Sequence, residues 1–163
     1  MQLRVLRHGD PTARPALLIV HGLFGSARNW GAIARRLAED SAVLVPDLRN
    51  HGESPWDAVH DYPALAADLA ALIEAEGAPM DVAGHSMGGK AAMVLALARP
   101  DLVRRLAVLD IAPVAYPHSR LPEIEAMRRV DPASVGTRGE AQAALGLSDA
   151  ATATFLIQSL DLP

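Results

Sequence analysis

The residues Gly84-His85-Ser86-Met87-Gly88 have the spacing of a serine nucleophile on a sharp turn. An apolar segment, Met80–Ala83, runs into this pentapeptide, and a segment with helical spacing, Gly88–Arg99, leaves it. Glycines two residues before and two after the serine remove side chains that would collide across such a turn. The hydroxyl would then be exposed, and the N–H of Met87 at the helix start would face a developing oxyanion. The pattern predicts Ser86 as a nucleophile; a serine with no catalytic role in a glycine-rich turn is the alternative.

The same stretch also resembles a phosphate-binding loop. Gly84 to Gly89 followed by Lys90 fits G-x-x-x-x-G-K between a strand and a helix. Position 91 is Ala, however, where that loop needs a Ser or Thr to bind Mg²⁺. We therefore set nucleotide hydrolysis aside and expect Lys90 to be a surface or supporting charge on the helix.

A second glycine-bearing turn, His21-Gly22-Leu23-Phe24-Gly25, follows the apolar run Ala16–Val20. A turn at the carboxyl end of a strand can present a backbone N–H to the active site of a neighbouring strand. An oxyanion hole needs two such donors. Met87 is predicted to supply one, and Leu23 the other, with Phe24 as the less favoured choice; an ordinary tight turn is the alternative.

The polar segment Asp47–Ser54 follows the apolar run Ala42–Val45. Its mixture of charged residues and glycine indicates a loop tied together by internal hydrogen bonds. We interpret it as structural, and do not expect His51 to be a catalytic base.

Asp110 closes the apolar run Leu106–Leu109. A carboxylate at the carboxyl end of a parallel strand stands at the same sheet edge as the serine, where it could orient an imidazole. The order Ser then Asp is the one found in hydrolases whose triad runs Ser, Asp, His. Asp110 is therefore the predicted triad acid, and a cap for the following turn is the alternative.

The elements around these motifs alternate between strand and helix. Five short runs rich in Val, Leu and Ile are predicted to be buried strands: Leu3–Leu6, Ala16–Val20, Ala42–Val45, Met80–Ala83 and Leu106–Leu109. Helical spacing is found in Trp30–Glu39, Tyr62–Glu76 and Gly88–Arg99, with Asp61 as an N-cap and Gly77 as a stop for the second. The alternation predicts an α/β fold whose mostly parallel sheet carries helices on both faces.

The pattern changes after Asp110. From Pro113 onward we expect helices only: Leu121–Arg129, one opened by a capping box at Thr137–Glu140, and one capped by Ser148 that runs through Ile157. We divide the chain into residues 1–112, the first part of the core, and residues 113–163, a linker and helical segment.

The composition narrows the classes of function. The net charge of −4 without a basic stripe argues against nucleic acid as a partner. No apolar run is long enough to span a membrane, and the N-terminus lacks the apolar stretch of a signal peptide. The absence of cysteine excludes thiolate metal sites and a cysteine nucleophile. We expect a cytoplasmic protein with no metal or cofactor.

With these motifs in this order, the chain resembles the α/β-hydrolase superfamily, and within it the small bacterial serine esterases related to a mitochondrial acyl hydrolase. The match is carried by four segments: HGLFGSARNW (21–30), PDLRNHGES (46–54), GHSMGGKAAM (84–93) and LDIAPVAYPH (109–118). The resemblance implies the α/β-hydrolase fold, strengthens Asp110 as the acid, and implies that the helices from about residue 120 begin a cap over an acyl pocket. Phe24 and His85 are our candidates for substrate contacts.

The family's catalytic histidine is where this sequence departs from the pattern. In the family that histidine lies near the C-terminus, after the cap and two more strands. Of the six histidines here, only His118 follows Asp110, and it does not match the family's base. We therefore expect a C-terminal companion segment or a second chain to supply the histidine, and expect residues 1–163 alone to be nearly inactive.

These observations favour a hydrolase that cleaves small acyl esters or thioesters through a Ser86 acyl-enzyme. Two alternatives stay open. One is a non-catalytic ligand-binding protein on the same scaffold. The other is a haloperoxidase or a carbon–carbon bond hydrolase of the same superfamily.

Overall fold

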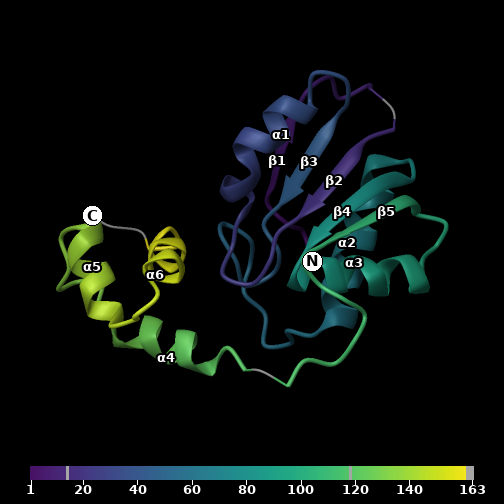
Figure 1. The fold of residues 1–163 in the computed structure, drawn as a ribbon. Coiled ribbons are helices and arrows are strands. Elements are labelled where there is room, and N and C mark those ends of the chain that lie inside the picture. The colour runs from purple at the N-terminus through teal and green to yellow at the C-terminus, as the bar shows by residue number, and fades with distance from the viewer. Residues whose placement is uncertain (14, 118, 161–163) are drawn as a thin grey trace. The chain divides into compact units, whose positions relative to one another are not determined.

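The structure is a computed structural model that describes residues 1–13, 15–117 and 119–160. The chain forms two compact units, Met1–Pro113 and Val114–Pro163 (Figure 1). The first unit contains a sheet and its covering helices, and the second contains only helices among its described residues. Since His118 lies outside the described residues, the structure does not test it as a base.

The sheet of the first unit has five strands in the order β1-β3-β2-β4-β5. The strands are β1 (Val5–His8), β2 (Leu17–Val20), β3 (Val43–Pro46), β4 (Met80–His85) and β5 (Val103–Leu109). Strands β2 to β5 are parallel to one another, and β1 is antiparallel to its neighbour β3. The carboxyl ends of the four parallel strands therefore meet at one sheet edge, which is where open α/β sheets bind ligands.

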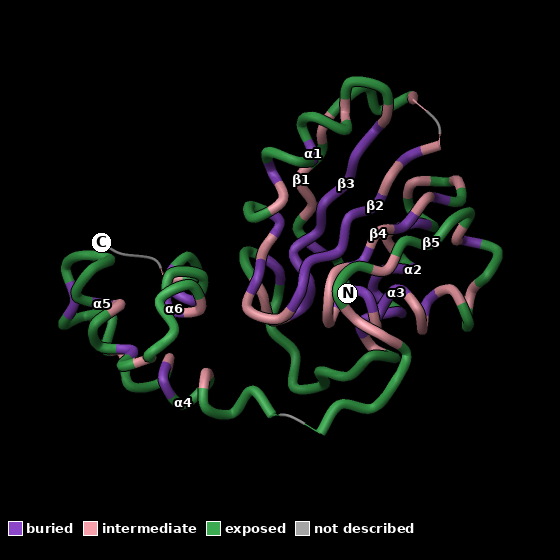
Figure 2. The backbone as a smooth tube through the Cα atoms, in the orientation of Figure 1, coloured by how far each residue is buried: buried purple, intermediate pink, exposed green. Residues whose placement is uncertain are grey.

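Helices cover both faces of this sheet (Figure 1). Alternate strand residues point to opposite faces, so Leu18 and Leu44 belong to one apolar core while Ile19 and Val43 belong to another. The first core includes α2 (Tyr62–Glu76) and α3 (Met87–Ala98). The second includes the 3₁₀ helix η1 (Ala27–Trp30) and α1 (Gly31–Leu37). Figure 2 shows the central strands buried and much of the edge strand β5 exposed.

Local signals placed the long helix α2 correctly. The Asp61 side chain accepts from Ala64 N at 2.8 Å and caps the first turn, as predicted. Gly77 ends the helix with a left-handed φ of 77°, a conformation that costs glycine little. The predicted bounds Tyr62–Glu76 are confirmed.

The bounds of β2, β3, β4 and α3 differ from the predicted ranges by one or two residues, and those of β1, β5 and the first helix are also wrong. β1 starts at Val5; the preceding Arg4 accepts from Asp47 N through its carbonyl, while its own N–H donates to the Ser54 hydroxyl. β5 starts three residues before the predicted Leu106. The charged Arg104 and Arg105 interrupt the apolar pattern, yet Val103 pairs with Met80 and Arg105 with Asp81 of β4. The predicted helix over residues 30–39 is divided into η1 and α1.

The second unit contains α4 (Leu121–Arg129), α5 (Arg138–Leu145) and α6 (Ala150–Ile157). The capping box of α5 is confirmed: Thr137 accepts from Glu140 N, and the Glu140 side chain accepts from Thr137 N. The cap predicted at Ser148 is wrong by one residue, because the Asp149 carboxylate accepts from Ala151 N and Thr152 N. The role of these helices as a cap stays a prediction.

Candidate active site

Ser86 stands on the turn between β4 and α3. Its backbone angles, φ 51° and ψ −117°, lie outside the regions that L-residues readily adopt. Two backbone bonds hold this conformation: Ser86 N donates to Leu109 O at 3.0 Å, and Lys90 N donates to Ser86 O at 3.1 Å. Strain of this kind persists where the surrounding structure fixes the backbone, and it clusters at active sites. The sequence-based expectation of a strained strand-to-helix turn at Ser86 is confirmed.

The flanking glycines make the turn sterically feasible. A Cβ at Gly84 would lie 2.5 Å from Gly88 O, and a Cβ at Gly88 would lie 2.4 Å from His21 O. Both contacts involve backbone atoms, which cannot move aside as a flexible side chain could. Glycine at these positions therefore lets β4 fold back onto α3 and lets α3 approach β2.

Asp110 occupies the equivalent position on the neighbouring strand. His85 of β4 pairs with Leu109 of β5, so Ser86 and Asp110 each follow one member of the same pair. Asp110 also has a positive φ, 56°, and its side chain is 89% exposed. Its Oδ2 lies 3.7 Å from His85 Nε2. The structure thus brings the predicted nucleophile and the predicted acid to the same sheet edge.

The turn after β2 lies directly against the serine. A Cβ at Gly22 would come within 3.2 Å of Ser86 Cβ, so a side chain there would crowd the nucleophile. Within this turn Gly25 N donates to Gly22 O, and Phe24 has a φ of 63°. Phe24 N donates to His51 Nε2 at 3.3 Å. Among the described residues, neither Leu23 N nor Met87 N donates a hydrogen bond.

His21 anchors the base of this turn. Its ring is 1% exposed; Nδ1 lies 2.8 Å from Gly22 O, and Nε2 accepts from Leu48 N at 3.0 Å. Burial disfavours the charged ring and lowers the pKa of His21 to about 4. His21 is therefore a neutral structural residue at neutral pH, and its imidazole is fully used in joining the turns after β2 and β3.

The loop Asp47–Ser54 is tied by internal bonds, as predicted. The Asp47 carboxylate accepts from Ala27 N at 2.7 Å and from Glu53 N at 3.0 Å. The Ser54 hydroxyl donates to Asp47 O at 2.6 Å. The predicted internal hydrogen bonds of this segment are confirmed, and its structural role stays a prediction.

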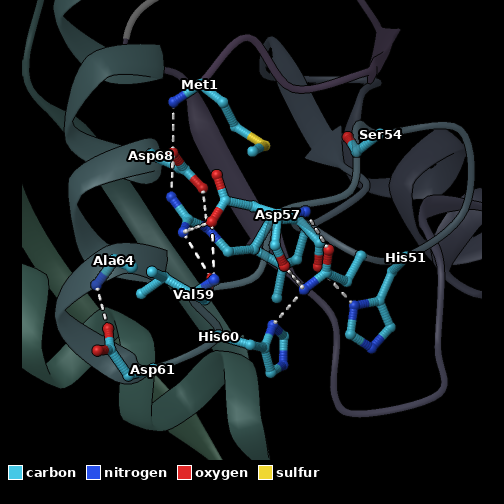
Figure 3. Close-up of polar contacts among 12 residues, drawn as sticks. Met1, His51, Ser54, Asp57, Val59, His60, Asp61, Ala64 and Asp68 are labelled. Atoms are coloured by element: carbon cyan, nitrogen blue, oxygen red, sulfur yellow. Dashed lines mark hydrogen bonds and ion pairs between the residues drawn. The ribbon is translucent and has the colours of Figure 1, made fainter.

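The sequence analysis missed a buried ion pair that fixes the same loop to α2. Arg49 binds both carboxylate oxygens of Asp68, at 2.7 and 2.9 Å, and also donates to Val59 O (Figure 3). Asp68 is 1% exposed, and its hydrogen bonds raise the pKa of the Arg49 guanidinium above its usual value. The available signal was an acidic residue on the apolar, buried side of a helix.

Of the two residues predicted to contact the substrate, His85 is next to Ser86 in the chain and Phe24 lies in the turn of residues 21–25. His85 directly precedes Ser86 and is 39% exposed on its side chain. Its ring centroid lies 6.1 Å from that of Trp30, a neighbour that the sequence analysis did not single out. Phe24 is half-buried in the turn that faces the serine. Their contact with a substrate stays a prediction.

Within residues 1–13, 15–117 and 119–160, there is no group of three or more His, Asp or Glu residues able to hold a metal ion. No helix in that part of the chain is long and apolar enough to cross a membrane.

Comparison with known proteins agrees with this geometry. A family model described as the alpha/beta hydrolase fold matches residues 15–155. An esterase of Escherichia coli (YbfF) is 42% identical over 149 residues, which is 88% of this chain and 58% of that protein. A diacylglycerol lipase of Mus musculus (ABHD11) is 47% identical over 112 residues, 67% of this chain and 36% of that protein.

A solved structure is also similar. An esterase from a marine microorganism superposes with a TM-score of 0.90 at 35% identity, covering 96% of this chain and 63% of that one. The chain thus spans less than two thirds of the length of these relatives. The family model matches most of its residues, and the strand order, the Ser86 turn and the turn of residues 21–25 agree with it. The chain belongs to the α/β-hydrolase fold family.

Proposed function

We propose that this protein is a serine hydrolase that cleaves carboxylic esters through an acyl-enzyme on Ser86. The observation that carries the proposal is the strained Ser86 turn with the glycine turn of residues 21–25 packed against it. The relatives named esterase or lipase support ester hydrolysis over the haloperoxidase and carbon–carbon hydrolase alternatives.

The proposed chemistry has two acyl-transfer steps. Ser86 Oγ attacks the ester carbonyl carbon, and its proton passes to a histidine. The tetrahedral oxyanion accepts hydrogen bonds from Leu23 N–H and Met87 N–H, and neither of these amides has another partner in the described part of the chain. Collapse expels the alcohol, which takes the proton, and water then releases the acid from Ser86.

Asp110 is the proposed triad acid. Its position one residue after the strand pair His85–Leu109 supports this role, because the carboxylate and the serine then share a sheet edge. Its high exposure leaves it accessible to an imidazole that arrives from elsewhere. The acid would fix the histidine tautomer and stabilise the imidazolium.

The base is the one group that the described residues do not provide. In the described part of the chain, no hydrogen bond joins the Ser86 hydroxyl to an imidazole. We propose that the histidine comes from a C-terminal continuation or a companion chain. The substrate is proposed to be a small acyl ester that contacts Phe24 and His85, without a metal or cofactor; the cytoplasmic location stays a prediction.

A fluorophosphonate probe tests the nucleophile. In the full-length protein it should add once, at Ser86, and labelling should vanish in Ser86→Ala. Ser41→Ala, at a serine of the same unit outside the four segments that carry the resemblance, is the matched control and should label normally. Adduct formation at another residue, or labelling that persists in Ser86→Ala, would refute the assignment.

A further inference from the structure

Two histidines, one in the turn after β2 and one in the turn after β3, each accept a hydrogen bond from a main-chain amide of the other turn. His21, in the turn after β2, accepts from Leu48 N in the turn after β3. His51, in the turn after β3, accepts from Phe24 N in the turn after β2. The two rings lie next to each other, with centroids 5.1 Å apart. Each turn therefore uses an imidazole to hold a main-chain amide of the other.

The partners of His51 determine where its proton sits. Nδ1 lies 2.9 Å from Arg49 O, and a carbonyl can only accept, so Nδ1 carries the hydrogen. Nε2 faces the Phe24 N–H, which can only donate, so Nε2 must be an unprotonated acceptor. This pairing requires one tautomer of the neutral ring. In a protonated ring, the Nε2–H of His51 would face the N–H of Phe24, and neither group could accept a hydrogen bond.

The bond to His51 has a consequence for the oxyanion turn. Phe24 has a left-handed φ of 63°, which is unfavourable for a residue with a side chain. The imidazole compensates by binding the Phe24 amide in this conformation. Because that amide is engaged, it is not available to an oxyanion, whereas Leu23 N–H has no partner among the described residues.

We propose that His51 is a positioning residue, which holds the Phe24 amide so that the Leu23 amide, and not that of Phe24, faces the oxyanion at Ser86. This inference rests on the proposed ester hydrolysis and adds the residue that sets the geometry of its oxyanion hole. His51 acts through the turn and does not touch the substrate.

The surroundings of His51 favour the neutral ring. Burial, with the neighbouring His60 as a further cause, lowers the pKa of His51, although Arg49 O and Asp47 act in the opposite direction. The His60 ring lies 5.7 Å away, beside His51 in Figure 3, and the His21 ring lies 5.1 Å away. The required tautomer is therefore populated at neutral pH, and the hold on Phe24 should be lost on acidification.

Two substitutions distinguish the effect of the hydrogen-bond acceptor of His51 from the effect of its side-chain volume. In His51→Gln, the amide oxygen can take the place of Nε2 as acceptor and does not titrate. In His51→Leu, the volume is roughly kept and the acceptor is lost. His60→Gln is the matched control, because that exposed neighbouring histidine does not bind the turn after β2.

On a short neutral ester, we expect loss of the acceptor to lower kcat and to leave KM nearly unchanged. In the full-length protein, His51→Leu should lower kcat by about 10- to 100-fold, less than the 10²–10³-fold typical of deleting an oxyanion donor, with KM changed little. His51→Gln should retain kcat within about 3-fold, and its activity should decline less than that of the wild type on acidification. His60→Gln should keep the wild-type kcat and KM at neutral pH, because His60 does not bind the turn after β2.

The inference and the function fail in different ways. If the wild type neither labels at Ser86 nor turns over ester, the proposed function is wrong. If it does both while His51→Leu and His51→Gln are equally active or equally impaired, the positioning role is wrong. Nitrogen NMR of the wild type gives a check that does not depend on a variant folding: a hydrogen-bond coupling between Phe24 N–H and His51 Nε2 is expected. A ring protonated at Nε2 at neutral pH would overturn the proposal.

Discussion

The strain at Ser86 should be measurable as a gain in stability when the side chain is removed entirely. Ser86→Ala deletes the hydroxyl but keeps Cβ, so the unfavourable φ of 51° and ψ of −117° still carry a side chain. Ser86→Gly deletes Cβ as well, and glycine tolerates positive φ. Both variants lack the nucleophile, so the loss of the hydroxyl does not contribute to their difference in stability.

Two opposing terms set the size of that difference. A residue held in a sparsely populated region costs about 1–3 kcal/mol, which glycine would recover. Glycine also gives the unfolded chain more freedom, which lowers stability by about 0.4–1 kcal/mol relative to alanine. The balance favours Ser86→Gly by about 1 kcal/mol. With an m-value of about 1–3 kcal/mol/M, the urea midpoint should rise by about 0.3–1 M.

The assay is urea unfolding of the two full-length variants followed by circular dichroism. Ser41 provides the control pair, because it lies in the same unit and is not among the described residues with positive φ. Ser41→Gly should be less stable than Ser41→Ala, the opposite sign. If Ser86→Gly is also less stable than Ser86→Ala, the turn stores no strain and the reasoning fails.

Three further predictions concern the acid and the buried polar groups. Asp110→Asn should lower kcat by up to about 10⁴-fold with little change in the urea midpoint, since the side chain is 89% exposed; near-normal kcat would place the acid elsewhere. Asp68→Ala leaves Arg49 buried without its carboxylate and should lower the free energy of unfolding by about 3–5 kcal/mol; a loss under about 1 kcal/mol would contradict the importance of the pair. For His21, the pKa of about 4 in the folded state lies below the ordinary 6.5. Between these values the unfolded chain binds the proton and the folded one does not, so stability falls as the pH drops through this window. The wild type should lose about 3 kcal/mol there relative to His21→Gln, and a difference that does not vary with pH would refute the assignment.

Much of the site could be predicted because its signals are local. The Ser86 turn, the Asp61 cap and the Thr137–Glu140 capping box each depend on residues within a few positions of one another. Side-chain size and hydrogen-bonding groups at such spacings restrict the backbone wherever the segment lies in the fold. The errors at Ser148 and at the start of β5 have a local cause too, since Asp149 caps equally well and Arg104 interrupts an apolar run.

The sequence by itself determined where a strand turns into a helix at Ser86, and that Asp110 ends another strand. Only the tertiary structure decided which of these ends meet. The pairing of His85 with Leu109 brings Ser86 beside Asp110, although 24 residues separate them in the chain. The bond from Phe24 N to His51 likewise depends on β2 and β3 being neighbours. The physical reason is that strand order and register are set by burial of both sheet faces as a whole, which no short segment of sequence encodes.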